Sequence, residues 1–265
     1  MAPWGGWVTD PDIFRKGSAT APPGYFEWEA AGLAWLAGAP GGARVARVVG
    51  RGPDYLDLVR LSFVNPTPDL AEAFGAGLAR THDAGAPAYG SAPPGWDGDG
   101  FLGPVSELLP LALRPTPTWG EFFAAQRLEP ALRMGVDKGL YRRSEIALFE
   151  AIIRRVARGE FDDGSTPARI HGDLWSGNVL WTAAGGVLVD PAAHGGHRET
   201  DLAMLALFGC PHWDFVVGGY LAQHRLDAQW RVRVGLHQLH PLMVHAVLFG
   251  ADYVHRAVQL GRRFR

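Results

Sequence analysis

The stretch IHGDLWSGNVLWTAAGGVLVD, residues 170–190, decides the fold of this chain. It predicts a tight β-hairpin with strand 179–181, turn 183–186 and return strand 187–189. In this hairpin Asn178 and Asp190 stand opposite each other at the open end, and Asp173 lies in the loop before it. Oxygen atoms of Asn178 and Asp190 are therefore expected to face one point.

These acidic and amide residues form a pattern typical of phosphoryl transfer. Their oxygens suit a hard cation such as Mg²⁺ bound to a nucleotide. Asp173 precedes Asn178 closely enough for its carboxylate to reach an attacking hydroxyl while Asn178 stays on the metal. The H-x-D-x-x-x-x-N spacing from His171 is that of kinase catalytic loops, and Asp190 takes the place of the aspartate of D-F-G. Each residue alone more often serves a turn, but together they favour a kinase site that binds Mg²⁺ with a nucleotide.

The composition argues against nucleic-acid and membrane partners. A net charge of −2 over 265 residues gives no electrostatic reason for either. The apolar run 202–222 contains Pro211, His212 and Asp214, so it is interpreted as buried helices and not as a membrane span. The single cysteine, Cys210, excludes an internal disulfide and reads as a packed thiol. The single cysteine and an N-terminus without signal-peptide features together predict a cytoplasmic protein.

A second candidate pair lies near the N-terminus. Lysine occurs only at Lys16 and Lys138, and Lys16 ends a predicted strand that begins at residue 13. The next element is a predicted helix that starts near Phe26 and carries Glu29 in its first turns. A strand lysine followed by a helical glutamate is the ion pair that positions nucleotide phosphates in kinases. The alternative is a solvated lysine and a glutamate favoured by the helix dipole.

The rest of the sequence predicts an α+β, two-lobed fold. Extended segments 44–49 and 55–61, joined by a turn at 50–54, are expected to form a small sheet with the first strand. Proline-rich residues 62–68 read as a linker. The chain is then mainly helical, with capping boxes at Asp69 and Thr118, a helix over 145–156 and a long loop over 84–117. We therefore expect a small N-terminal sheet lobe, 1–61, and a larger helical lobe, 62–265.

Three residues after the hairpin are further candidates. Asp201 is expected in the first turn of the following helix, where it could accept hydrogen bonds from the loop that holds Asp173. His197 and Glu199 are expected beside the cleft, where either contact with substrate or a local His–Glu hydrogen bond would explain them. Three histidines near the C-terminus could suggest a zinc site: His237, His240 and His245. This site is disfavoured because Pro241 interrupts the helical pattern and no carboxylate or cysteine completes the set of ligands.

Several segments make the sequence similar to the fructosamine kinase family, also called ketosamine-3-kinases. The central matches are 171–178, 189–192, 196–204 and 207–209. Further matches lie at 26–33, 77–82, 101–103, 119–128 and 238–250. The resemblance covers nearly the whole chain from about Ile13, and D-L-W-S-G-N is far more specific than the general kinase spacing.

The resemblance implies a protein-kinase-like fold and transfer of the γ-phosphoryl of ATP to the sugar 3-hydroxyl of a ketosamine. The acceptor would be a small-molecule ketosamine or a glycated amine or protein. By resemblance Asp173 would be the base, Asn178 and Asp190 magnesium ligands, Lys16 the phosphate contact and Glu29 its partner, and Trp175 would help to shape the sugar pocket. Apart from the resemblance, His171 and Asp201 are expected to give structural support, with Asp201 favoured in this role over direct catalysis.

One departure from the family pattern leaves alternatives open. Family members begin with a hairpin whose glycine-rich turn covers the phosphates, whereas here only Gly5-Gly6 lies close to Lys16 and no G-x-G-x-x-G is found. The lobe is therefore expected to be reduced, or its true start lies upstream. The alternatives are a related aminoglycoside-, choline- or sugar-type kinase and a pseudokinase that binds nucleotide without turnover. The oligomeric state stays open.

Overall fold

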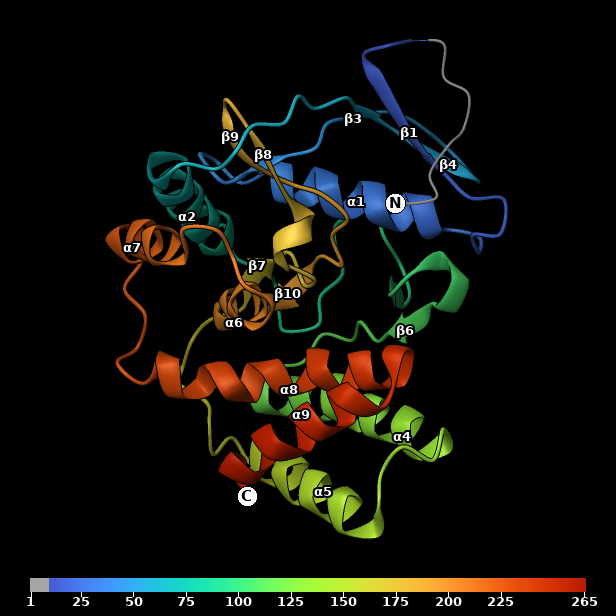
Figure 1. Ribbon diagram of the computed structural model, residues 1–265, viewed down its shortest axis with the longest axis vertical. Helices are drawn as coiled ribbons and strands as arrows, with labels where there is room; N and C mark the ends of the chain where they lie inside the picture. Colours follow the sequence, from blue (N-terminus) through green and yellow to red (C-terminus); the bar gives the residue numbers. More distant parts are fainter. Residues whose placement is uncertain (1–9) are drawn as a thin grey trace.

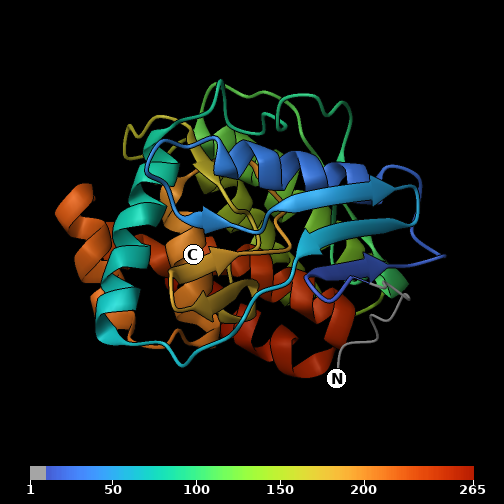
Figure 2. The same ribbon diagram turned by 90° about the horizontal axis from the view of Figure 1, so that it is seen from above.

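The computed structural model describes residues 10–265 (Figure 1), and Gly5-Gly6 lies outside this range. Strands β1 (Ile13–Gly17), β4 (Tyr55–Val59) and β3 (Val48–Gly52) form an antiparallel sheet in the order β1-β4-β3. Helix α1 (Tyr25–Ala37) runs alongside this sheet (Figure 2). Phe26 and Leu33 of α1 join Leu56 and Leu58 of β4 in one apolar cluster, so burial of these side chains fixes the helix on the sheet.

The predicted strand 44–49 is divided in the structure. Its first part, β2 (Arg44–Val45), pairs in parallel with β9 (Gly185–Leu188), and only its second part enters the N-terminal sheet as β3. The backbone N–H of Ala46 donates to the carbonyl of Leu188 at 2.9 Å, which extends this pairing. The predicted turn also shrinks to two residues, because Gly52 pairs with Tyr55. Strand β2 thus joins the N-terminal segment to the hairpin that precedes Asp190.

The predicted hairpin is present with a shorter turn than expected. Strands β8 (Val179–Thr182) and β9 (Gly185–Leu188) pair from Val179–Leu188 to Thr182–Gly185, which leaves a two-residue turn. The Thr182 hydroxyl donates to the Gly185 carbonyl at 2.9 Å and closes this turn. At the other end the carbonyl of Asn178 accepts from the N–H of Val189 at 3.1 Å, so Asp190 lies one residue beyond the pair.

The remainder is mainly helical, and the predicted long loop contains a small hairpin that the sequence did not reveal. The helices are α2 (Pro68–Asp83), α3 (Trp119–Phe123), α4 (Glu129–Asp137), α5 (Arg143–Ala157), α6 (Arg198–Phe208), α7 (Trp213–Gln223), α8 (Trp230–Phe249) and α9 (Ala251–Gly261). Short helical turns are Val105–Glu107, the π-helical Ala124–Leu128, Ser176–Asn178 and Arg262–Phe264. The remaining strand pairs are β5 (Gly100–Leu102) with β6 (Leu109–Leu111) and β7 (Ala168–Ile170) with β10 (His194–Gly196).

Two local predictions are corrected or refined by the helix ends. Helix α2 is capped by Thr67, whose hydroxyl accepts from the N–H of Leu70 at 3.3 Å, and not by Asp69. Pro68 then occupies the first helical position, where its missing N–H costs nothing. The apolar run 202–222 is shared between α6 and α7, as expected for buried helices. Among residues 10–265, every helix is too short or too polar to cross a bilayer.

Candidate active site

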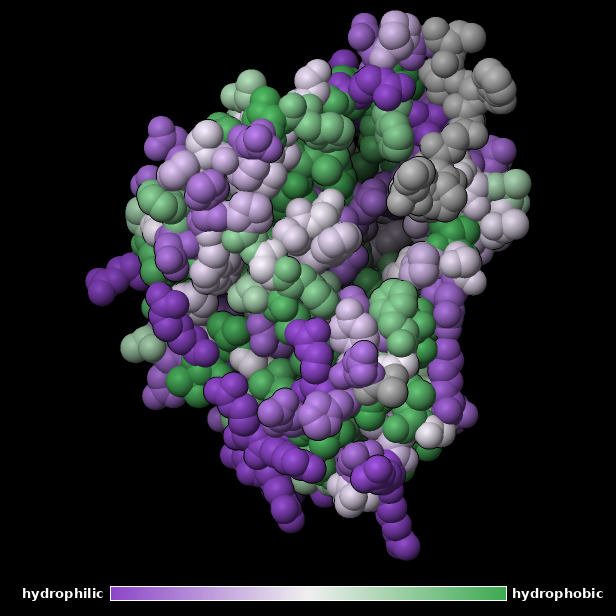
Figure 3. All heavy atoms as spheres, viewed as in Figure 1, coloured by the Kyte–Doolittle hydropathy of each residue, from purple (hydrophilic) through white to green (hydrophobic). Residues whose placement is uncertain are grey.

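The residues of the central stretch meet at one cavity of about 720 Å³. Figure 3 shows the molecule hollowed on the face where α1 lies above and α8 below. Polar residues line one part of the cavity and are Lys16, Glu29, Asp173, Asn178 and Asp190. Apolar and aromatic residues from β5, α6, α8 and α9 line the other part and include Phe101, Met204, Phe208, Val244, Leu248 and Tyr253. The cavity therefore joins an ionic half to an apolar half.

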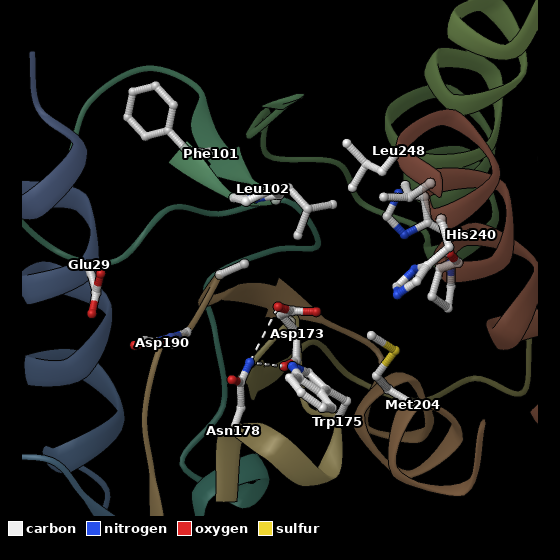
Figure 4. Close-up of a pocket in the computed structure, with 18 of the residues that line it drawn as sticks. Glu29, Phe101, Leu102, Asp173, Trp175, Asn178, Asp190, Met204, His240 and Leu248 are labelled. Carbon is white, nitrogen blue, oxygen red and sulfur yellow. Dashed lines mark hydrogen bonds between the residues drawn. The ribbon is translucent and has the colours of Figure 1, made fainter. Parts of the chain in front are cut away.

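Asn178 connects the catalytic-type loop to the hairpin (Figure 4). Its amide nitrogen donates to the Asp173 carbonyl at 2.8 Å and to the Asp173 carboxylate at 3.3 Å. Because both acceptors are oxygens, the amide nitrogen must occupy this side and the amide oxygen the other. That oxygen makes no hydrogen bond with any residue in the range 10–265, and Asn178 lines the cavity. It is available as a neutral oxygen ligand.

Asp173 has an electrostatic environment that favours proton uptake. Burial and the nearby charge of Asp190 raise the pKa of Asp173 to about 7, although the hydrogen bond from Asn178 acts in the opposite direction. A carboxylate whose pKa lies near neutrality is suited to accept a proton from a hydroxyl and release it afterwards.

Asp190 is presented to the cavity by an unusual backbone conformation. Its φ is +52°, in the left-handed region that Asp and Asn tolerate better than other side chains with a Cβ. One carboxylate oxygen lies 3.0 Å from the ammonium of Lys16, which is also 2.7 Å from Glu29. Burial alone would lower the pKa of Lys16, but the charges of Glu29 and Asp190 raise it above its ordinary value. The ammonium is therefore held charged between two elements that are distant in sequence.

The donor set of this half fits Mg²⁺ and phosphate. The Asp190 side chain is 48% exposed, so it can still accept a ligand after contacting Lys16. Asn178 adds the amide oxygen described above. Carboxylate and amide oxygens, with water and phosphate completing the coordination, are the ligands that Mg²⁺ prefers. A buried ammonium beside them offers the positive charge that a phosphate needs.

Asp201 holds the loop of Asp173 in place through hydrogen bonds. This carboxylate is fully buried and accepts from the backbone N–H groups of His171 and Gly172 at 2.7 and 3.0 Å. Its second contact is the ring of His82, at 3.1 Å. Gly172 has φ +81°, and a Cβ there would lie 2.2 Å from the carbonyl oxygen of Ala192. The H-G-D segment therefore needs glycine at its centre in order to present both N–H groups to Asp201.

His171 and Trp175 complete the loop. The Nε2 of His171 donates to the carbonyl of Val189 at 2.8 Å, while its Nδ1 accepts from the N–H of Asp173 at 3.2 Å. Burial lowers the pKa of this histidine, so a neutral ring ties the loop to the end of β9. Trp175 is exposed and lines the cavity. Its indole ring lies over Gly177, where a Cβ would approach it to 2.2 Å.

His197 and Glu199 do not lie where substrate contact would require. Both are buried and neither lines the cavity, so the structure offers no substrate contact at either residue. His197 contacts Asp163 at 3.2 Å, and its other ring nitrogen accepts from the backbone N–H of Glu199. Glu199 binds the guanidinium of Arg233, with Nε donating at 2.9 Å. An ion pair between α6 and α8 explains Glu199, whereas His197 caps α6 and contacts Asp163 in the loop before β7.

The same cluster contains the one group of possible metal ligands found among the described residues: His197, Glu199 and His237. Arg233 contacts both oxygens of Glu199 and also reaches Asp163, so a guanidinium already supplies the positive charge there. The two remaining C-terminal histidines, His240 and His245, line the cavity instead. The three C-terminal histidines therefore do not gather at one point.

The Glu199 ion pair predicts a measurable dependence of stability on pH. Burial alone would raise the pKa of Glu199, but contacts with His237 and Arg233 lower it to about 2, and Arg233 makes the closer contact. A lowered carboxyl pKa contributes stability above about pH 4.5 that is lost as the pH falls. We expect Glu199→Gln to have a lower free energy of unfolding in urea than the unchanged protein at pH 6. At pH 4 the difference between the two free energies should be smaller by about 1 kcal/mol.

The matched control for this prediction is Glu150→Gln, because Glu150 is exposed on α5. Its stability should follow that of the unchanged protein at both pH values. A gap between Glu199→Gln and the unchanged protein that is the same at pH 6 and pH 4 would contradict the ion-pair explanation.

Some residues of the site were not recognisable from the sequence. Tyr25, which lines the cavity, lies outside every segment that the sequence singled out. Thr200 and His240 also line the cavity and lie in segments similar to the family, but those segments did not indicate which side chains face the cavity. Arg233 and Asp163 are distant in sequence and meet only through packing. The helical period of the sequence could have placed some of these residues on the same face of their own helix. It could not have shown which residues of different elements come into contact.

The chain has a protein-kinase-like fold. An aminoglycoside phosphotransferase in a ternary complex with streptomycin and ATP has the same fold, with a TM-score of 0.60 at 11% identity over 95% of this chain and 86% of that one. The profile of the fructosamine kinase family matches residues 9–264. The chain therefore belongs to the fructosamine kinase family.

Individual relatives agree with this assignment. A candidate fructosamine-3-kinase from Thermobifida fusca superimposes with a TM-score of 0.86 and 44% identity, covering 95% of this chain and 84% of that one. A probable ketoamine kinase from Synechocystis is 34% identical over 245 residues, which are 89% of this chain and 77% of the relative. The predicted family and fold class are confirmed.

Proposed function

We propose that the protein phosphorylates the sugar 3-hydroxyl of a ketosamine, using ATP and Mg²⁺. The observation that carries this proposal is the convergence of Asp173, Asn178 and Asp190 on a cavity that also has an apolar half. An ionic half suits phosphates, and an apolar half of this size suits the sugar and amine of a small acceptor. Membership of the fructosamine kinase family supports the choice of acceptor.

Each polar residue has a role in this reaction. Asn178 and Asp190 would hold Mg²⁺, which neutralises phosphate charge when bound. Lys16, held by Glu29, would contact the phosphates. Asp173 would take the proton of the attacking hydroxyl, and its hydrogen bond from Asn178 keeps base and metal ligand in register. Because phosphoryl transfer depends mainly on positioning and charge neutralisation, these residues supply the main requirements.

The charge of the cavity disfavours an aminoglycoside acceptor. Its acidic residues are Glu29, Asp173 and Asp190, and each already has a place in the ionic half. A polycationic acceptor needs further carboxylates, which the apolar half does not offer. The pseudokinase alternative is disfavoured because the candidate base and both metal ligands are present and in contact or close together.

The test is Mg²⁺-dependent release of ADP from ATP by the purified chain, with fructosyl-lysine, ribulosyl-lysine, an aminoglycoside or choline as acceptor. We expect release to be stimulated by the ketosamines, and phosphorus NMR to place the phosphate on the oxygen of C3. Stimulation only by the aminoglycoside or choline would assign a different acceptor. Phosphate on another sugar carbon would contradict the proposed position.

A further inference from the structure

His240 projects into the cavity from α8. In Figure 4 its ring points from that helix toward the loop of Asp173, across the cavity. The side chain is partly buried and lines the cavity wall. No hydrogen bond, ion pair or ring contact joins it to any residue in the range 10–265. A partly buried imidazole with both nitrogens unused is costly unless a ligand or water satisfies them.

The neighbouring histidines on α8 have partners within the protein. His237 pairs through Nδ1 with the hydroxyl of Thr200 at 3.0 Å. His245 donates through Nδ1 to the carbonyl of Pro241 at 2.7 Å. The helix therefore fixes these two rings in place, whereas His240 is left facing the cavity.

The surroundings of His240 hold it neutral. Burial lowers the pKa of His240 well below its usual value, and the nearby guanidinium of Arg127 acts in the same direction. Arg127 is itself buried, and among residues 10–265 its guanidinium donates to the backbone carbonyls of Ala112 and Gln126. Burial lowers the pKa of Arg127 to about 9, although the nearby charge of Asp99 acts in the opposite direction. A neutral imidazole offers one donor and one acceptor.

The acceptor side of the cavity has few other polar groups. Met204, Phe208, Val244 and Leu248 present only apolar surface. A sugar that enters here loses water from several hydroxyls, and each needs a partner to avoid a penalty of about 1–3 kcal/mol. His240 is placed to supply one on the side opposite Asp173.

We propose that His240 binds the acceptor sugar, with its ring donating to or accepting from a hydroxyl next to the one that reacts, and so orients the reacting hydroxyl toward Asp173. This inference rests on the proposed function, and it makes His240 a determinant of sugar recognition. The amine portion is then directed to the aromatic part of the cavity, at Phe208 and Tyr253.

The test compares His240→Phe and His240→Gln with the unchanged protein, using ribulosyl-lysine and its deoxy analogues. His240→Phe should raise the KM for the ketosamine about tenfold, which is the effect of losing one neutral hydrogen bond. The KM for ATP and the acceptor-independent hydrolysis of ATP should stay unchanged. His240→Gln keeps a donor and an acceptor and should restore part of the loss.

The deoxy analogue that lacks the bound hydroxyl gives the sharpest comparison. The unchanged protein should discriminate against it, and His240→Phe should not. His255→Phe is the matched control, because His255 is exposed on α9 and does not line the cavity. If the unchanged protein is active and His240→Phe has the same acceptor KM and the same discrimination against the deoxy analogue, only the role of His240 is overturned. No ketosamine phosphorylation by the unchanged protein would overturn the proposed function and this inference with it.

Discussion

Asp173→Asn is expected to lower kcat for ketosamine phosphorylation by ~10²–10⁴-fold, because an amide cannot accept the proton of the attacking hydroxyl. The substitution keeps the shape of the side chain and can keep a hydrogen bond with the Asn178 amide. Binding of ATP should therefore change little. Steady-state kinetics at saturating ATP and Mg²⁺ measure the effect.

Thermal unfolding separates loss of the base from loss of the fold. Burial and the charge of Asp190 raise the pKa of Asp173, so the folded state disfavours the ionised carboxylate. Replacing it by a neutral amide removes this penalty, and the Tm of Asp173→Asn at pH 8 should equal or exceed that of the unchanged protein. A kcat within tenfold of the unchanged protein would contradict the assignment of Asp173 as base.

Asp190→Asn is expected to lower turnover by ~10²–10³-fold at low Mg²⁺, because it removes the one charged ligand proposed for the metal. Asparagine is the informative replacement, since it tolerates the φ of +52° at this position, whereas alanine would add backbone strain. Part of the loss should be recovered at high Mg²⁺. Activity measured as a function of Mg²⁺ concentration gives the shift directly.

The control is Asp137→Asn, an exposed carboxylate at the end of α4. Its Mg²⁺ dependence should match that of the unchanged protein. If Asp190→Asn lowered turnover equally at every Mg²⁺ concentration, the loss would arise from the broken contact with Lys16 at 3.0 Å and not from the metal. A double substitution with Lys16→Met would then show the coupling between the two residues.

Local sequence patterns located the hairpin and one of the two predicted helix caps, whereas the cap of α2 is Thr67 and not Asp69. Alternation and turn residues placed β8 and β9, and Thr118 caps α3 as predicted, with its hydroxyl accepting from the N–H of Glu121 at 3.4 Å. The errors came from competition between local and long-range pairing. Segment 44–49 had the alternation of one strand, but β9 offered Arg44 and Val45 a parallel partner that no local pattern can reveal.

Glu199 shows the same limit at the level of the site. From the sequence alone, a charged residue close to the residues that line a predicted cleft is interpreted as a substrate contact. In the folded chain Glu199 does not line the cavity, and its carboxylate forms a buried ion pair with Arg233 on another helix. Burial of both groups makes the pairing strong enough to decide the orientation of the side chain.

The sequence by itself determined the chemistry: the family, the kinase-like fold class, and the spacing that sets Asp173 five residues before Asn178. These follow from short-range order, since a loop and a hairpin fix neighbouring residues through the backbone. The sequence predicted the ion pair of Lys16 with Glu29 but left a solvated lysine open. Only the tertiary structure decided between the two, and showed that Lys16 also contacts Asp190 and that His240 faces the cavity. Such contacts depend on how whole helices and sheets pack to bury apolar surface, and this packing is a property of the complete chain.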